Sequence, residues 1–147
     1  MDKVKLHDSQ FELWGKRAKA AITELLPLDW DTRIEHIGST SVPGLPAKDV
    51  VDILIGVRPE RIQPIAQELK KRGYDLEGSF SDHCWLSLPS RHNRQSIFHI
   101  VHLNSRRWTR RIAFRDLLRE SSSARAKYLA VKQIAATSSG KKEPTVK

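Results

Sequence analysis

The sequence has a single cysteine, Cys84, among its 147 residues, so no disulfide can form within the chain. Proteins folded in oxidising compartments commonly use paired cysteines, and a reducing cytoplasm is therefore the expected location. Also absent is an apolar run of the ~18 residues that a membrane-spanning helix needs. The first ten residues, MDKVKLHDSQ, lack the apolar core of a signal peptide. These absences predict a cytoplasmic protein with no membrane partner.

Acidic residues are in the minority, with 17 Asp and Glu against 26 Lys and Arg, and the net charge is +9. Such a surplus attracts phosphate-bearing partners over long distances. Nucleic acid, a nucleotide and a phosphorylated metabolite all fit this charge, and so does plain solubility. The largest basic cluster, RRWTRR at residues 106–111, is predicted to be mostly the solvated face of a helix.

The hydrophobic pattern predicts one domain of mixed α and β structure over residues 1–137. Helical periodicity is found at residues 9–26, 59–72, 105–120 and 121–136. Strands are expected at residues 33–38, 50–57, 74–78, 84–89 and 96–103. Residues 138–147 have no apolar face and are expected to form a flexible basic tail. The predicted fold class is α+β, with a mixed sheet of about four or five strands.

A glycine followed by three hydroxyl residues stands between two apolar runs, in HIGSTSVPGLPAKDVVD at residues 36–52. Gly38 comes directly after an expected strand, where glycine lets the backbone approach a ligand. The hydroxyl and amide groups of Ser39, Thr40 and Ser41 can surround phosphate oxygens. The stretch therefore predicts a site for a nucleotide or another phosphorylated small molecule, with a polar turn between strands as the alternative.

Two charged residues follow the turn and extend this interpretation. Lys48 could neutralise phosphate charge, and the carboxylate of Asp52, on the next strand, could hold Mg²⁺. The ATPase P-loop does not match, because Gly38 and Gly44 are six residues apart rather than five and Leu45 replaces the required lysine.

Longer segments carry a more specific resemblance. RIEHIGSTSVPGLPAKDVVDILIGV, residues 33–57, is similar to the hallmark EHIGSTSVPGLxAKPxxDI of the GrpB family, a branch of the nucleotidyltransferase superfamily. FHIVHLNSRRWTRRIAFRDLLR at 98–119 and SARAKYLAVK at 123–132 add two matches, and the resemblance covers roughly residues 5–135. It implies a nucleotidyltransferase-like fold, with a mixed sheet and helices packed mainly on one face. It implies no established reaction.

The superfamily reaction uses two carboxylates on one strand, and usually a third on a neighbour, to hold two metal ions. Because strand side chains alternate, Asp52 is expected to share its face with Val50 and Leu54 rather than with a second acid. Asp49 is expected on the opposite face and stands where the family commonly has proline. Asp52 is therefore the one residue assigned both a catalytic and a metal-binding role, with Mg²⁺ as the cofactor.

Three further residues complete the predicted site. His99 matches a family histidine and is the second catalytic candidate, since imidazole can act as a base near neutral pH. His36 and Arg115 are assigned to substrate binding, together with the turn and Lys48. For each of the three, a purely structural hydrogen-bonding role is the alternative.

The sequence thus predicts a protein that binds a nucleotide or another phosphorylated ligand at the Gly-Ser turn, with Mg²⁺-dependent nucleotidyl or phosphoryl transfer as the candidate reaction. The alternative is a non-catalytic module that binds a nucleotide or RNA and has an eroded active site. The oligomeric state is left open, with a homodimer among the options.

Overall fold

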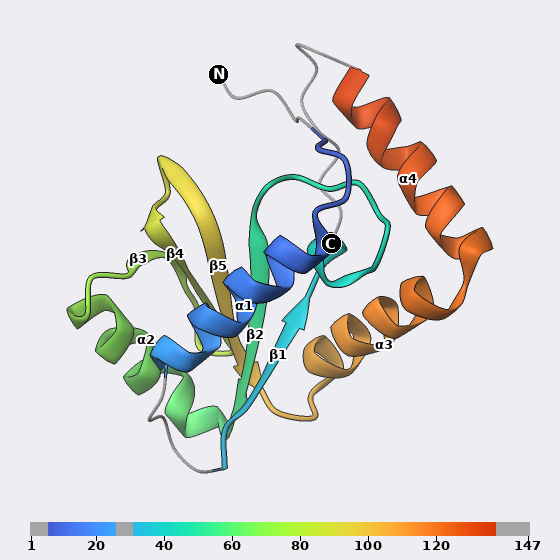
Figure 1. Ribbon diagram of the computed structural model, residues 1–147. Helices are drawn as coiled ribbons and strands as arrows, with labels where there is room; N and C mark the ends of the chain where they lie inside the picture. Colours follow the sequence, from blue (N-terminus) through green and yellow to red (C-terminus); the bar gives the residue numbers. More distant parts are fainter. Residues whose placement is uncertain (1–5, 26–30, 138–147) are drawn as a thin grey trace.

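A computed structural model describes residues 6–25 and 31–137 (Figure 1). Its helices are α1 (Phe11–Leu25), α2 (Ile62–Lys71), α3 (Arg106–Glu120) and α4 (Ser122–Thr137). Its strands are β1 (Arg33–Ile37), β2 (Val51–Val57), β3 (Asp75–Ser79), β4 (His83–Ser90) and β5 (Asn93–His102). Two short 3-10 turns are η1 (Ser39–Ser41) and η2 (Pro59–Arg61).

The five strands form one mixed sheet in the order β1-β2-β5-β4-β3. Only β2 and β5 pair in parallel, while the other neighbours are antiparallel. The α+β class and the expected mixed sheet of about four or five strands are therefore confirmed. Strand β2 lies inside the sheet, which explains why its sequence, VDILIGV, is apolar at nearly every position.

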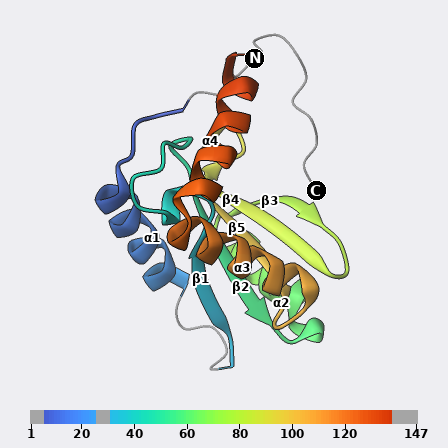
Figure 2. The ribbon, with the colours of Figure 1, turned by 90° about the vertical axis from the view of Figure 1, so that its right-hand side faces the viewer.

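Helices α1 and α2 cover one face of the sheet and enclose the main core. Alternation along the strands directs Ile53 and Ile55 of β2, with Phe98 and Ile100 of β5, toward these helices. Helix α3 packs on the opposite face, where Trp108 contacts Leu54 and Val101 in a smaller apolar cluster. Figures 1 and 2 show the sheet between these two groups of helices.

Element boundaries differ from the expected ones by small amounts, and two of the differences are informative. Pro59 begins a 3-10 turn rather than an α-helix, and the α-helix begins at Ile62. His83, expected in a loop, is the first residue of β4 because it pairs with Val101 of β5. Burial differs as well: the apolar periodicity at residues 121–136 makes Ile134 available for burial, but Ile134 is 65% exposed.

Some predictions fall partly outside the described residues. The tail at 138–147 is one, and the domain bounds of 1–137 include residues 1–5 and 26–30, which are also not described. Among the residues that are described, no helix is both long and apolar enough to cross a membrane.

The packing of the smaller apolar cluster around Trp108 can be tested by a substitution at Gly56. A Cβ atom at Gly56 would lie 2.7 Å from the Trp108 ring and 2.8 Å from Leu103, inside a packed interface. We expect Gly56→Ala to lower the free energy of unfolding by about 1–3 kcal/mol. Gly15→Ala is the control, because nothing lies within 4 Å there and alanine is the better helix former by about 0.5–1 kcal/mol. Urea unfolding of both variants measures the contrast, and equal destabilisation would contradict the packing.

Candidate functional site

Gly38, directly after β1, lies against Asp52, the second residue of β2. Gly38 has φ of 77° and ψ of −176°, a backbone conformation that is essentially restricted to glycine. A Cβ atom at this position would lie 2.7 Å from Oδ2 of Asp52. Glycine is therefore required twice, by its backbone angles and by the carboxylate beside it.

The three hydroxyl residues after Gly38 each have a different partner. Ser39 Oγ shares a 2.8 Å hydrogen bond with the hydroxyl of Tyr128 on α4. Thr40 Oγ1 shares one of 2.8 Å with His36 Nε2. Ser41 is fully buried, and its Oγ donates to the Gly38 carbonyl at 2.5 Å. Thus Ser41 shapes the turn, while Ser39 and Thr40 line a pocket.

The loop that carries the turn is held from two sides. On the α1 side, the indole nitrogen of Trp14 donates to Oδ1 of Asp49 at 2.9 Å, and Arg17 lies 3.0 Å from the same oxygen. On the other side, Arg119 Nε donates to the Ser41 carbonyl at 2.9 Å, and Leu118 packs with Val42 and Leu45. As predicted, Asp49 lies away from Asp52, and it anchors α1 to the loop.

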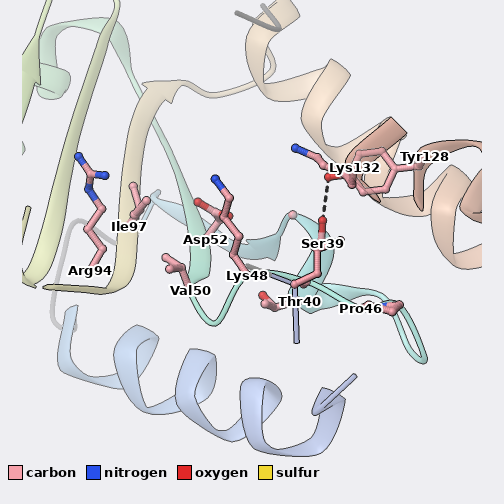
Figure 3. A pocket seen from close by; sticks show the side chains of 13 residues that line it. Ser39, Thr40, Pro46, Lys48, Val50, Asp52, Arg94, Ile97, Tyr128 and Lys132 are labelled. Carbon is pink, nitrogen blue, oxygen red and sulfur yellow. Dashed lines mark hydrogen bonds between the residues drawn. The ribbon is translucent and has the colours of Figure 1, made fainter. Parts of the chain in front are cut away.

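A pocket of about 330 Å³ lies over Gly38, Ser39, Thr40 and Asp52. Its basic lining residues are Lys48 from the loop, Arg94 from β5 and Lys132 from α4. Figure 3 shows these side chains reaching the pocket from three separate segments. Asp52 is the one acidic residue in the lining, so the pocket combines several cations with one carboxylate. This balance suits an anionic ligand.

Arg94 reaches the pocket because strand β5 is irregular. Leu88 pairs with Ser96 but Pro89 pairs with Arg94, so Gln95 is an extra residue in the ladder. A bulge of this kind moves the next side chain to the other face of the strand. Arg94 therefore lies on the same side as Asp52, where it also pairs with the nearly buried carboxylate of Glu77.

Two histidines continue from Asp52 across the sheet. His99 Nε2 lies 3.5 Å from Oδ1 of Asp52, and His99 Nδ1 shares a 3.3 Å hydrogen bond with Nε2 of His83. Burial lowers the pKa of His83 to about 4, with the charges of His99, Arg107 and Arg111 acting in the same direction. His83 is therefore neutral at physiological pH. One Asp52 oxygen faces His99 and the other faces Gly38.

The carboxylates needed for two metal ions are not assembled here. Leu54, two residues beyond Asp52 on the same face, is fully buried in the α3 cluster. Glu35 pairs with Leu54 across the strands, but its Oε1 accepts a hydrogen bond from Arg115 at 2.7 Å. Within residues 6–25 and 31–137, no three His, Cys, Asp or Glu side chains gather in a group that could hold a metal.

The structure brings five predicted residues together in the pocket: Gly38, Ser39, Thr40, Lys48 and Asp52. Four others, Ser41, His36, His99 and Arg115, are not among the lining residues. Arg115 bonds Glu35, Asp116 and the His36 carbonyl, so it joins α3 to β1.

Sequence reasoning missed three polar residues of the pocket lining, Arg94, Tyr128 and Lys132. Lys132 and Tyr128 lie within the third family-like segment, SARAKYLAVK, so a signal for them was present. Arg94 had no comparable signal, because a strand bulge cannot be read from side-chain alternation alone.

The fold resembles that of nucleotidyltransferases. A structure of the Cid1 poly(U) polymerase matches with a TM-score of 0.58 and 14% identity, over 87% of this chain and 40% of that one. This likeness concerns the fold alone. The chain therefore has a nucleotidyltransferase-like fold, with a Gly-Ser turn at the carboxylate of β2.

The sequence profile described as GrpB protein matches residues 3–145. The chain belongs to the GrpB family. The crystal structure of conserved protein GrpB from Enterococcus faecalis superposes with a TM-score of 0.75 and 27% identity, covering 93% of this chain and 86% of that chain.

Curated relatives carry the family designation UPF0157. The protein from Deinococcus radiodurans is 41% identical over 101 residues, which is 69% of this chain and 53% of the relative. One from Streptomyces coelicolor is 34% identical over 86% of this chain and 66% of its own length. The chain spans about half the length of the Deinococcus radiodurans and Halalkalibacterium halodurans relatives.

Gly38 allows a direct test of the contact with Asp52. We expect Gly38→Ala to destabilise the protein more than Gly44→Ala, because both glycines have positive φ but only Gly38 has a neighbour within 4 Å. Adding Asp52→Ala to Gly38→Ala should recover part of the loss, since the two side chains would no longer collide. Urea unfolding of the wild type, Gly38→Ala, Asp52→Ala and the double variant gives the coupling energy. Additive effects of the two substitutions would show that a methyl group at position 38 and the Asp52 carboxylate do not collide.

His36 makes the stability depend on pH. Burial lowers its pKa from 6.5 to about 4, although the charge of Asp52 opposes the shift. Between about pH 6.5 and pH 4, the unfolded chain therefore binds a proton at this histidine that the folded chain does not bind. As a result, the free energy of unfolding falls as the pH drops from 6.5 toward 4. We expect His36→Gln, which can still bond Thr40, to lose less stability over this range than the wild type. Parallel losses in urea titrations at pH 7 and pH 4.5 would contradict this assignment.

Proposed function

We propose that this protein binds a nucleotide or a similar phosphorylated ligand, with the phosphates over Gly38, Ser39 and Thr40. The observation that carries the proposal is the pocket that brings Lys48, Arg94 and Lys132 around this turn. Phosphate oxygens need hydrogen-bond donors and positive charge together, and the pocket offers both. The net charge of +9 adds a long-range attraction for such ligands.

Magnesium can take part in this binding through one carboxylate. Mg²⁺ is commonly held by one or two carboxylates together with the phosphates of the substrate, and it keeps several water molecules. Asp52 fits that role, because its Oδ2 lies against the turn. The two-ion arrangement of the superfamily does not fit, since the position that should carry the second acid is Leu54.

The reaction class that follows is nucleotidyl or phosphoryl transfer, with His99 beside Asp52 as the group that can accept a proton. Catalysis would be positioning and charge stabilisation, which the basic lining supplies. The alternative is a module that binds a nucleotide or RNA without turnover, and Leu54 favours it. Incubation with ATP, Mg²⁺ and a hydroxyl-bearing acceptor separates the two, because transfer releases pyrophosphate or ADP and a binding module releases neither.

Binding itself is tested by isothermal titration calorimetry with ATP. We expect Ser39→Ala and Lys132→Ala each to weaken ATP binding by roughly tenfold, the range of a charge-assisted hydrogen bond. Lys71→Ala, on α2 and outside the pocket, is the matched control and should leave the affinity unchanged. Failure of the wild type to bind ATP, with and without Mg²⁺, would refute the proposal.

Asp52 distinguishes metal-assisted from metal-free binding. Without Mg²⁺ its charge repels phosphate, so Asp52→Asn should bind ATP more tightly than the wild type in EDTA. With Mg²⁺ the order should reverse, because the variant has lost the carboxylate that holds the ion. Calorimetric titrations under the two conditions measure both effects. The same order of affinities in EDTA and in Mg²⁺ would exclude a metal at Asp52.

A further inference from the structure

A row of ring side chains crosses the sheet from the pocket toward its outer edge. Beyond Asp52 and His99, the rings of His83 and His99 stack with centroids 5.5 Å apart. Trp85 follows, 4.9 Å from His83, and Phe80 stacks on Trp85 at 5.8 Å with an angle of 26° between the planes. The row therefore ends in two adjacent aromatic rings, and we call Trp85 and Phe80 the aromatic ledge.

The two rings of the ledge are not buried in the apolar core. Phe80 is 59% exposed, while Trp85 is partly exposed. A Cβ atom at Gly78 would fall 2.2 Å from the Trp85 ring, so the indole lies directly over the glycine backbone. Trp108 of α3 packs elsewhere, with Leu54 and Val101. The ledge thus presents one largely exposed and one partly exposed aromatic ring at the surface.

Positive charge lies beside the ledge as well as in the pocket. The charges of Arg107 and Arg111 both act on His83, and Arg107 lies 3.9 Å from Asp82 at the start of β4. Arg111 also lies within electrostatic range of Asp52. A ligand that reaches from the turn to the ledge would pass basic side chains along the way.

The strand register sets the distance between the pocket at Asp52 and the ledge at Trp85. Asp52 pairs with Ile97, and Ile97 with Ser87, while Trp85 lies two residues farther along β4. Two strand spacings across and two residues along place Trp85 about 12 Å from Asp52 between backbones. An extended nucleoside triphosphate can bridge this separation, with its phosphates at one end and its base at the other.

We propose that the aromatic ledge of Trp85 and Phe80 binds the base of the nucleotide whose phosphates occupy the pocket at Gly38–Thr40. The inference rests on the proposed function, and it deepens that function by identifying the ligand as a nucleoside polyphosphate rather than a phosphorylated metabolite without a base. Aromatic stacking tolerates every base, because each has a π-face. ATP and UTP should therefore bind with similar affinity.

The test compares ATP with inorganic tripolyphosphate, which has the phosphates but no base. We expect Trp85→Ala to weaken ATP binding by between about fivefold and a hundredfold, the range of one base stacked on an aromatic side chain. Tripolyphosphate binding should not change. Phe80→Ala provides a second variant with little risk to folding, because the ring is mostly exposed, and it should weaken ATP binding in the same way. Leu13→Ala, an exposed apolar residue on α1, is the control, and circular dichroism checks the fold of each variant.

The possible outcomes distinguish base binding at the ledge from phosphate binding in the pocket. If the wild type binds ATP and tripolyphosphate but Phe80→Ala and Trp85→Ala leave ATP binding unchanged, the ledge is refuted and the phosphate pocket stands. If neither compound binds, the proposed function fails and the inference with it. If the variants lose affinity for a single-stranded oligonucleotide but keep it for ATP, the ledge binds a nucleic acid strand, and the mononucleotide assignment is overturned.

Discussion

The contact between Gly38 and Asp52 is the constraint on which the site depends. A carboxylate can lie against a backbone turn only where the turn residue has no side chain, and Gly38 meets this condition with 2.7 Å between its missing Cβ and Oδ2 of Asp52. The surrounding structure keeps the turn at that position. Helix α1 holds the loop through Trp14 and Asp49, and the α3 and α4 side holds it through Arg119 and Tyr128. Hydrogen bonds from residues far apart in the chain thus hold one short backbone segment in place.

The charge balance distinguishes this site from the two-metal arrangement of the superfamily. There, several carboxylates gather metal ions, and the ions neutralise phosphate. Here Leu54 occupies the second acidic position and is needed for packing against Trp108. Glu35 is likewise engaged, with Arg115. The positive charge at this pocket is instead carried by three side chains of its lining, Lys48, Arg94 and Lys132. The pocket of this chain therefore carries protein cations where a two-metal site carries bound metal ions.

Local patterns were enough to predict much of the fold. The apolar run at β2, the helical stripes and the Gly-Ser turn each follow from residues close together in the sequence, and the α+β class followed from their order. The predictions were wrong where residues distant in the sequence determine the secondary structure or the burial of a residue. His83 has the local composition of a loop, yet pairing with Val101 makes it the start of a strand. Ile134 lies on a plausible apolar stripe, but the face it occupies on α4 is solvent-exposed.

The sequence by itself determined the turn, the single carboxylate of Asp52 and the family, because these depend on residue identity at fixed spacing. Only the tertiary structure decided which cations surround that carboxylate. Arg94 faces the pocket through a bulge at Gln95, and Tyr128 reaches Ser39 across 89 residues of chain. It also placed Trp85 and Phe80 on the face of the sheet that carries Asp52. Strand register and helix packing are set by contacts between distant segments, and no local pattern encodes them.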